Sequence, residues 1–201
     1  ILCGYGRQPD GTYFDPHTGY VFYYNFDTNE VIPTGIKGPE QSPLCTELLP
    51  KLESYVFSAY RESSCAAVYS VTGGGIVIIL RSSSISIQNF CTGGIFGQYY
   101  LQPNGQLSGS IKSLQHYFEE GNSFAHFDCN MPPESIDMTQ TNSEISDQIL
   151  DTITRFESRY RKAAMNAYDS VDENRALSIL RLKLPYTGTR INWELELSTR
   201  K

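Results

Sequence analysis

The first 43 residues of the chain alternate short aromatic runs with residues that favour turns. The stretch "YGRQPDGTYFDPHTGYVFYYNFDTNEVI" contains Pro-Asp-Gly and Asp-Pro-His-Thr-Gly, both strong turn signals. Aromatic runs between such turns predict small antiparallel hairpins. Residues 33–43 are rich in Pro and Gly and are predicted to form a loop. Residues 1–43 are therefore expected to be a β-hairpin globule with a trailing loop.

Residues 44–64 change to the spacing of a helix. The apolar side chains on one stripe of this helix are Leu48, Leu52, Tyr55, Val56 and Ala59. Pro50 is expected within the first turns, where a missing N–H costs little. From residue 65 to residue 130 the pattern becomes β-rich, with runs such as "AAVYSVT" and "IVIILRS" separated by tight turns. Consecutive short strands of this kind predict an antiparallel meander.

A second helical pattern follows the Pro132-Pro133 break. No Gly or Pro occurs from Ser143 to Lys183, and Ser143 is the expected N-cap. The apolar residues at helical spacing are Ile145, Ile149, Ile153, Phe156, Tyr160, Ala163, Ala167 and Val171. A helix of about 38 residues is about 57 Å long, more than this chain's own sheet needs. We therefore expect the helix to lie along a second subunit as well.

These patterns predict an α+β fold, an antiparallel β-meander covered by one long helix. The expected parts are 1–43, the hairpin globule and loop; 44–64, a helix; 65–130, the sheet; 131–183, a linker and the long helix; and 184–201, a C-terminal turn and amphipathic segment.

Charge is distributed unevenly along the chain. The 201 residues carry a net charge of −6, which argues against a general affinity for nucleic acid or anionic membranes. Residues 175–201 hold six basic and two acidic side chains, giving +4, whereas the other 174 residues give −10. The C-terminal tip is thus opposite in charge to the body.

The five cysteines include no C-x-x-C pair, and an odd number favours free thiols in a reducing compartment. No run approaches the roughly 20 apolar residues of a membrane span, and no signal-like start is present. The chain begins at Ile1, without Met, in an apparent strand, so we expect an N-terminal segment to be missing.

Candidate chemistry is sparse. His17, His116 and His126 stand apart, without a carboxylate or cysteine at metal-ligand spacing. Residues 72–75, Thr-Gly-Gly-Gly, precede a strand, which favours a hairpin turn over a phosphate cradle. The adjacent pair at 119–120, Glu-Glu, points to opposite faces of a strand, and no Gly-x-Ser-x-Gly motif occurs. We therefore predict no enzyme activity, cofactor, metal or small-molecule substrate. The 14 Tyr and 10 Phe are interpreted as core and interface packing rather than base stacking.

Several strings, in order, resemble one family. "YFDP" at 13–16 and "VFYYNFD" at 21–27 look like a hairpin of that family, and Asn89-Phe90 with Gly93 sits in its Asn-Phe motif. The strings "HYFEEGN" at 116–122 and "LPYTGTRINW" at 184–193 are more specific. The resemblance covers essentially the whole chain and is to the alpha subunit of the heterodimeric F-actin capping protein.

The resemblance implies a mushroom-shaped dimer with a capping protein beta subunit, in which two meanders join into one sheet crossed by both long helices. A homodimer through the same sheet edge is the alternative. It also implies that the family's N-terminal helical stalk is absent here. The residues expected at the dimer interface are His116, Tyr117, Phe118, Ile145, Ile149, Ile153, Phe156 and Tyr160.

For function, the resemblance implies binding to the barbed end of an actin filament, which blocks subunit addition and loss without catalysis. The expected location is the cytoplasm, on the cytoskeleton. The implied actin-binding residues, which include the amphipathic tentacle after Trp193, are Arg181, Lys183, Arg190, Trp193, Leu195, Leu197, Arg200 and Lys201.

Departures from the family leave a second interpretation open. Ser178, Leu182 and Gly188 stand where the family is usually basic, although Lys183 adds a positive charge. The alternative is a divergent scaffold subunit in a dynactin-like or other cytoskeletal assembly, with weak or no direct actin capping.

Overall fold

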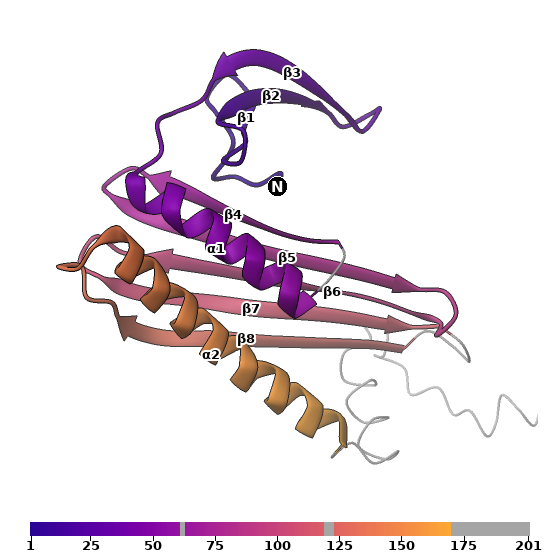
Figure 1. Ribbon diagram of the computed structural model, residues 1–201. Coiled ribbons are helices and arrows are strands. Elements are labelled where there is room, and N and C mark those ends of the chain that lie inside the picture. Colours follow the sequence, from indigo (N-terminus) through magenta and orange to yellow (C-terminus); the bar gives the residue numbers. More distant parts are fainter. Residues whose placement is uncertain (61–62, 119–122, 170–201) are drawn as a thin grey trace, which may run out of the picture. The chain divides into compact units, whose positions relative to one another are not determined.

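The computed structural model describes residues 1–60, 63–118 and 123–169 (Figure 1). Contacts divide the chain into two compact units, Ile1–Tyr160 and Arg161–Lys201. The elements are β1 (Tyr13–Phe14), β2 (Tyr20–Asn25), β3 (Glu30–Lys37), α1 (Pro43–Tyr60), β4 (Ser64–Val71), β5 (Gly75–Ser86), β6 (Cys91–Leu101), β7 (Gln106–Tyr117), β8 (Ser123–Ser135) and α2 (Asn142–Asp169). The predicted α+β class is confirmed.

The N-terminal strands form a three-stranded antiparallel sheet in the order β1-β2-β3. Its register pairs Tyr13 with Phe22 and Phe14 with Val21. The prediction of a loop over 33–43 was wrong for its first five residues, because β3 continues to Lys37. Pro33 is compatible with this strand because β3 lies at the sheet's edge, where a missing donor leaves no ladder bond unmade. Aromatic β2 thus has a partner on each side.

The second sheet is a five-stranded antiparallel meander in the order β4-β5-β6-β7-β8, as the β-rich pattern predicted. The Thr-Gly-Gly-Gly segment at 72–75 forms the turn between β4 and β5. Gly73 and Gly74 have φ angles of 93° and 85°, in the left-handed region that favours glycine. The backbone conformation of this turn is sufficient to explain the glycines, so a role in binding phosphate is not needed to account for them.

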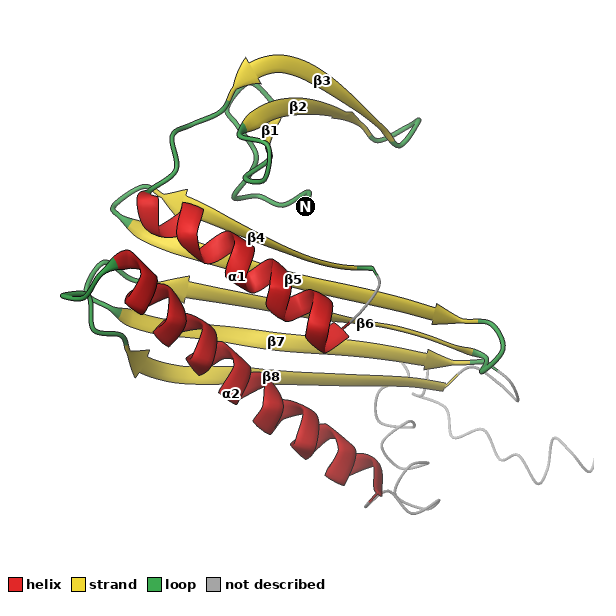
Figure 2. Cartoon of the chain, viewed as in Figure 1, coloured by secondary structure: helices red, strands yellow, loops and turns green. Residues whose placement is uncertain are grey.

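Helices α1 and α2 cover the same face of the five-stranded sheet (Figure 2). On α1 the predicted stripe is confirmed at Leu48, Leu52 and Val56, which are buried against β4 and β5. The helix is described to Tyr60, and residue 64, its predicted end, already belongs to β4. Because α1 begins at Pro43, Pro50 lies in the helix interior rather than in the first turns. Pro50 has no N–H to donate to the backbone carbonyl oxygen one turn earlier in the helix. Because Pro50 is exposed, water can reach that oxygen instead.

The N-terminal sheet docks on the opposite face of the five-stranded sheet. Its buried contact is a small cluster consisting of Phe14, Val21, Ala67, Tyr69, Val77 and Ile79. His17, in the turn between β1 and β2, adds polar contacts at this junction. Its Nδ1 lies 2.7 Å from the Glu53 carboxylate, and its Nε2 lies 2.9 Å from the Ala66 carbonyl oxygen. The Glu53 carboxylate of α1 therefore lies beside this histidine in space, although the two residues are 36 positions apart in sequence.

Helix α2 begins at Asn142, and its N-cap is Thr141 rather than the predicted Ser143. The Thr141 amide and hydroxyl donate to the Glu144 carboxylate at 3.0 and 2.8 Å, and the Glu144 amide donates back to the Thr141 hydroxyl at 3.4 Å. These bonds make a capping box, and they hold the pKa of the Glu144 carboxyl below its ordinary value. The helix is described to Asp169, and the rest of the predicted helix, to Lys183, lies outside the described residues.

Candidate functional site: a buried carboxylate and an exposed sheet end

The inner stripe of α2 faces the chain's own sheet. Ile145, Ile149, Ile153, Phe156 and Tyr160 are at most 7% exposed and belong to the main core cluster. They were predicted to lie at the interface with a second subunit, and that assignment stays a prediction. Within this chain their side chains pack on β5 to β8, on α1 and on one another.

One charged side chain sits within this apolar stripe. Glu157 of α2 is fully buried, and it is the one buried charged residue in the part of the chain that the structure describes. Tyr55 of α1 donates to its Oε2 at 2.7 Å, and Tyr99 of β6 donates to its Oε1 at 2.7 Å. Tyr60 of α1 also donates to Oε2. Three hydroxyls thus replace the water that this carboxylate loses on burial.

Two glycines make room for the Tyr99 ring, which carries one of these hydroxyls. The Tyr99 ring lies over Gly97 and Gly109, where an added Cβ would come within 3.0 and 2.4 Å of ring atoms. A side chain at either position would therefore push Tyr99 away from the carboxylate. The cluster of Glu157, Tyr55, Tyr60 and Tyr99, which we call the tyrosine–carboxylate cluster, joins α1, β6 and α2 in one polar contact.

Burial also changes how these tyrosines titrate. Burial, followed by the charge of Glu157, raises the pKa of Tyr99 far above its ordinary value. Burial likewise raises the pKa of Tyr69 well above that value. Burial raises the pKa of Tyr160 as well, against the opposing effect of its 2.5 Å hydrogen bond to Ser113.

We expect these three tyrosines to remain neutral in the folded protein well above pH 10. In the unfolded chain a tyrosine ionises near pH 10. The stability that the neutral phenols provide is therefore complete below about pH 10 and is lost as the pH rises further. Titration of the tyrosinate absorbance should show that Tyr69, Tyr99 and Tyr160 ionise only as the protein unfolds, and Tyr99→Phe should remove one such group. The exposed Tyr23→Phe is the control. Ionisation of all tyrosines near pH 10 without unfolding would contradict this account.

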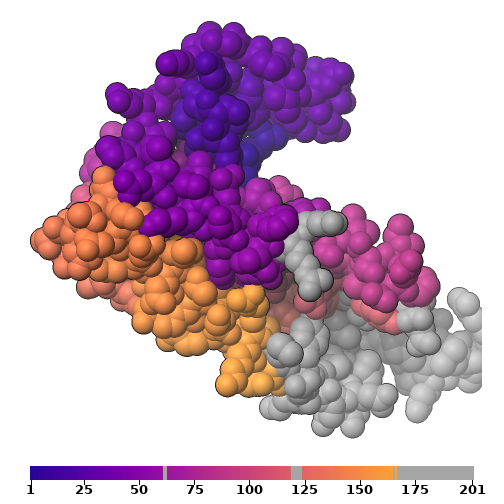
Figure 3. Space-filling view, in the orientation of Figure 1, coloured from indigo at the N-terminus to yellow at the C-terminus, as the bar shows by residue number. Residues whose placement is uncertain are grey.

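Pairs of charged residues cover the outer side of α2. Arg155 and Arg159 contact Glu134 of β8 at 3.0 and 3.3 Å. Lys51 of α1 reaches across to Asp147 at 2.6 Å, where the two helices lie side by side (Figure 3). Exposed pairs of this kind contribute at most about 1 kcal/mol each. These pairs connect α2 to β8 and to α1, so the charges are neutralised within the chain rather than offered to a ligand.

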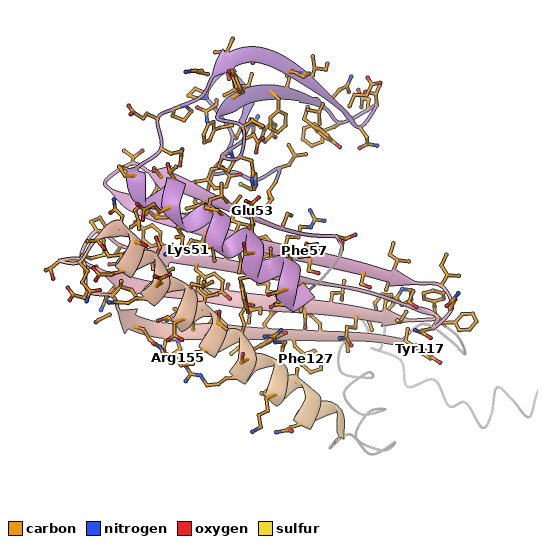
Figure 4. All side chains as sticks on the ribbon, viewed as in Figure 1. Lys51, Glu53, Phe57, Tyr117, Phe127 and Arg155 are labelled. Carbon is orange, nitrogen blue, oxygen red and sulfur yellow. The ribbon has the colours of Figure 1, made fainter. Side chains whose placement is uncertain are left out.

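Large apolar side chains are exposed at one end of the five-stranded sheet, where Figure 4 places Tyr117. We call this surface the apolar sheet end; its members are Ile85, Ile87, Phe90, Leu114, Tyr117 and Phe124, which are 40% to 75% exposed. His116 and Phe118, predicted with Tyr117 to lie at a dimer interface, are in the same place. His116 stacks on Phe124 with ring centroids 4.2 Å apart, and Phe118 lies edge-on to Phe90 at 6.0 Å.

Candidate metal ligands are dispersed across the described part of the chain. Across residues 1–60, 63–118 and 123–169, no group of three or more His, Cys, Asp and Glu could hold a metal ion. Every buried side-chain nitrogen or oxygen in those ranges has a hydrogen-bond partner. His126 pairs with Asp128 at 3.1 Å on the sheet surface. Within the described part of the chain, no helix is both long and apolar enough to cross a membrane.

The residues predicted to bind actin lie beyond Asp169, outside the described residues. They are Arg181, Lys183, Arg190, Trp193, Leu195, Leu197, Arg200 and Lys201. The tyrosine–carboxylate cluster, by contrast, was missed at the sequence level. A signal for it exists, because Glu157 continues the apolar spacing of Ile149, Ile153 and Tyr160, and a Glu on a core stripe needs partners.

Comparison with solved structures supports the fold. The structure of a homodimeric actin capping protein alpha subunit from Plasmodium berghei superposes with a TM-score of 0.68 at 18% identity. The match covers 94% of this chain and 74% of that one. The protein is therefore an α+β protein with the capping-protein alpha fold.

Sequence comparison identifies the family. Residues 1–200 match the family model described as F-actin capping protein alpha subunit. The F-actin-capping protein subunit alpha of Yarrowia lipolytica is 25% identical over 198 residues, 98% of this chain and 70% of that protein. That of Gibberella zeae is 27% identical over 203 residues, covering 100% of this chain and 72% of the relative. The chain belongs to the F-actin capping protein alpha subunit family, as its motifs predicted.

Proposed function

We propose that this chain is one subunit of a complex that binds the barbed end of actin filaments and blocks subunit addition and loss without catalysis. The observation that carries the proposal is the family match over residues 1–200. A cap acts by occupying the surface that the next subunit would bind, so it needs affinity and shape rather than reactive groups. The expected place of action is the cytoskeleton in the cytoplasm.

A second subunit is part of the proposal. The outer edge of β8, 13 residues long, has no neighbouring strand in the part of the chain that the structure describes. Such an edge can pair with another chain. The apolar sheet end begins at the first residues of β8, so one partner can cover both. The Plasmodium berghei relative is described as homodimeric, which supports a dimer. The partner is a capping protein beta subunit or a second copy of this chain.

The dimer proposal predicts a strong effect of charge at the apolar sheet end. Tyr117→Glu places a carboxylate where the partner removes water, and loss of one such central contact costs about 2 kcal/mol or more. The dimer dissociation constant should rise about 30-fold or more. Sedimentation velocity and native mass spectrometry measure it. Tyr23→Glu, at a comparably exposed tyrosine of the N-terminal sheet, should leave the dimer intact. An unchanged dissociation constant in Tyr117→Glu would place the interface elsewhere.

We assign the filament contact to the basic C-terminal tip. Arg181, Lys183 and Arg190, with Arg200 and Lys201 at the chain end, are proposed to supply charge. Trp193, Leu195 and Leu197 are proposed to supply apolar contact after binding. Attraction between a tip of charge +4 and an acidic filament end raises the association rate, and apolar burial slows release.

The loss of some expected charges favours a second candidate function. Ser178, Leu182 and Gly188 are uncharged. A tip with fewer contacts suits a scaffold subunit that keeps the capping-protein fold in a dynactin-like or other cytoskeletal assembly.

Elongation of actin from barbed-end seeds distinguishes the two functions. A capping complex reduces the elongation rate in proportion to the fraction of ends it occupies. A scaffold with no direct capping leaves the rate unchanged even when the dimer is in large excess over ends. The dimer is purified with its partner before the assay, so that failure to bind cannot be attributed to an incomplete complex.

A further inference from the structure

The buried stripe of α2 nearly repeats itself every four residues. Ile145, Ile149 and Ile153 are identical side chains at this spacing, and the aromatic residues Phe156 and Tyr160 are also four positions apart. All five are buried in the main core cluster. If α2 moved along its axis by four residues, about 6 Å, Ile would replace Ile and one ring would replace another. Apolar packing alone therefore distinguishes poorly between these registers of the helix on the sheet.

Glu157 breaks this repeat. It is fully buried and accepts hydrogen bonds from all three tyrosines of the tyrosine–carboxylate cluster. A shift of four residues in one direction would bring Ile153 to its place and take this acceptor away from the three hydroxyls. A shift in the other direction would bring Arg161 to that place and move Glu157 into the apolar place of Ile153. A buried charge that leaves its partners is costly, so the cluster favours one register.

The other polar contacts of α2 distinguish the registers less. Its capping box moves with the helix, and its ion pairs with α1 and β8 are exposed, where such pairs contribute little. The 2.5 Å contact between the hydroxyls of Tyr160 and Ser113 supports the same register, but both groups are neutral. Residues 136–141 connect β8 to α2 and restrain its start, although a helix end can unwind by a turn. The buried charge is therefore the strongest determinant of register.

We propose that the tyrosine–carboxylate cluster sets the register of α2 and thereby positions the C-terminal tip for the filament contact. In coiled coils, one buried polar residue fixes the register of helices whose apolar residues would accept several. The sequence pattern predicts that α2 continues to Lys183, so Arg181 would move with the helix. The positioning of the tip rests on the proposed function, whereas the choice of register does not.

The test replaces the whole cluster with apolar side chains. The fourfold variant carries Glu157→Leu, Tyr55→Phe, Tyr60→Phe and Tyr99→Phe, so the three hydroxyls are removed together with their acceptor. Replacing a fully bonded buried polar cluster in this way often leaves stability unchanged. The variant should therefore unfold at a urea concentration close to that of the unmodified chain. It should also populate a second register to about 30% or more, because the two arrangements then bury similar side chains.

Pulsed electron paramagnetic resonance on the dimer measures the register as a distance between two spin labels. The labels are placed at Thr46 of α1 and Ser158 of α2, which are both exposed. The two helices lie side by side and begin at the same end of the sheet (Figure 2), so a shift of four residues changes this distance by up to about 6 Å. The labels react with introduced ketone side chains, which leaves the five cysteines unmodified. Dilution with unlabelled chain removes distances between copies.

Two further variants separate register from stability. Glu157→Gln keeps an acceptor oxygen in the cluster, and Ile149→Val weakens the same stripe without touching the cluster. Both should give the single narrow distance of the unmodified chain, whereas the fourfold variant should give two distances. A single, unshifted distance in the fourfold variant would overturn the proposal, as would two distances in Ile149→Val. Failure of the fourfold variant to fold would also overturn it, because the cluster would then be required for folding itself.

Inhibition of elongation from barbed-end seeds by the same dimers tests the link to the tip. The apparent dissociation constant for filament ends should rise by the inverse of the fraction in the original register, about twofold if half of the molecules are shifted. Two registers with an unchanged dissociation constant would disprove that link. Absence of inhibition by the unmodified dimer would instead contradict the proposed function, and the distance measurement would still decide the register.

Discussion

Glu157→Ala should lower the free energy of unfolding by about 3–6 kcal/mol, since three tyrosine hydroxyls lose a buried acceptor at once and each unsatisfied group costs about 1–3 kcal/mol. The hydroxyls come from Tyr55 and Tyr60 of α1, which are half-buried, and from Tyr99 of β6, which is fully buried. A domain is stable by only about 5–15 kcal/mol, and the loss is therefore a large share of the total. Urea denaturation of the dimer measures it.

Milder variants keep this prediction testable if Glu157→Ala does not fold. Glu157→Gln preserves the shape but replaces one acceptor oxygen with a donor, and it should cost about 1–3 kcal/mol. Asp151→Ala is the matched control, because it removes an exposed carboxylate of the same helix whose contact with Arg155 is 3.8 Å long. That control should cost less than about 0.5 kcal/mol. Equal stability of Glu157→Gln and Asp151→Ala would contradict a structural role for the cluster.

Charge reversal in the C-terminal tip should have the largest effect on filament binding. In the proposed filament contact, each of Arg181→Glu and Arg190→Glu would remove a charged hydrogen bond worth roughly 1.5–3 kcal/mol and add repulsion. The double variant should therefore weaken binding to filament ends at least about 100-fold. Its affinity should also depend less on salt than that of the unmodified dimer, because fewer charge pairs remain to be screened.

The control reverses the same number of charges elsewhere. Arg7 and Lys37 are exposed on the N-terminal part of the chain, so Arg7→Glu with Lys37→Glu changes the net charge equally. This control should alter affinity only through long-range attraction, which is weak at physiological salt. Equal losses in the two double variants would show that net charge, rather than the tip, determines binding.

Much of the fold could be predicted from the sequence because its signals are local. Turn residues and β-branched runs predicted the meander, and the helical stripe of Leu48, Leu52 and Val56 predicted the buried side of α1. The failures depended on tertiary context. Pro33 was assigned to a loop, yet a strand edge accommodates a residue without a donor. The start of α2 was misplaced because Thr141 and Glu144 cap reciprocally, a pairing that outweighs the choice of Ser143 alone.

The candidate site was harder to predict than the fold. An apolar stripe shows that a helix is buried but not against which chain. The residues from Ile145 to Tyr160 were assigned to a partner, and in this structure they pack against the chain's own sheet. Glu157 is an exception to the pattern of that stripe, and its partners are 58 to 102 positions away in sequence. Contacts over such separations follow from the fold and cannot be read from spacing.

Single-filament fluorescence microscopy tests the central claim most directly, because both ends of one actin filament are observed in the same field. When the purified dimer is added, growth at barbed ends should stop while pointed ends continue to grow at their unmodified rate. The double variant with Arg181→Glu and Arg190→Glu should leave barbed ends growing at the same concentration. Uninterrupted growth at both ends with saturating dimer would contradict filament capping by this protein.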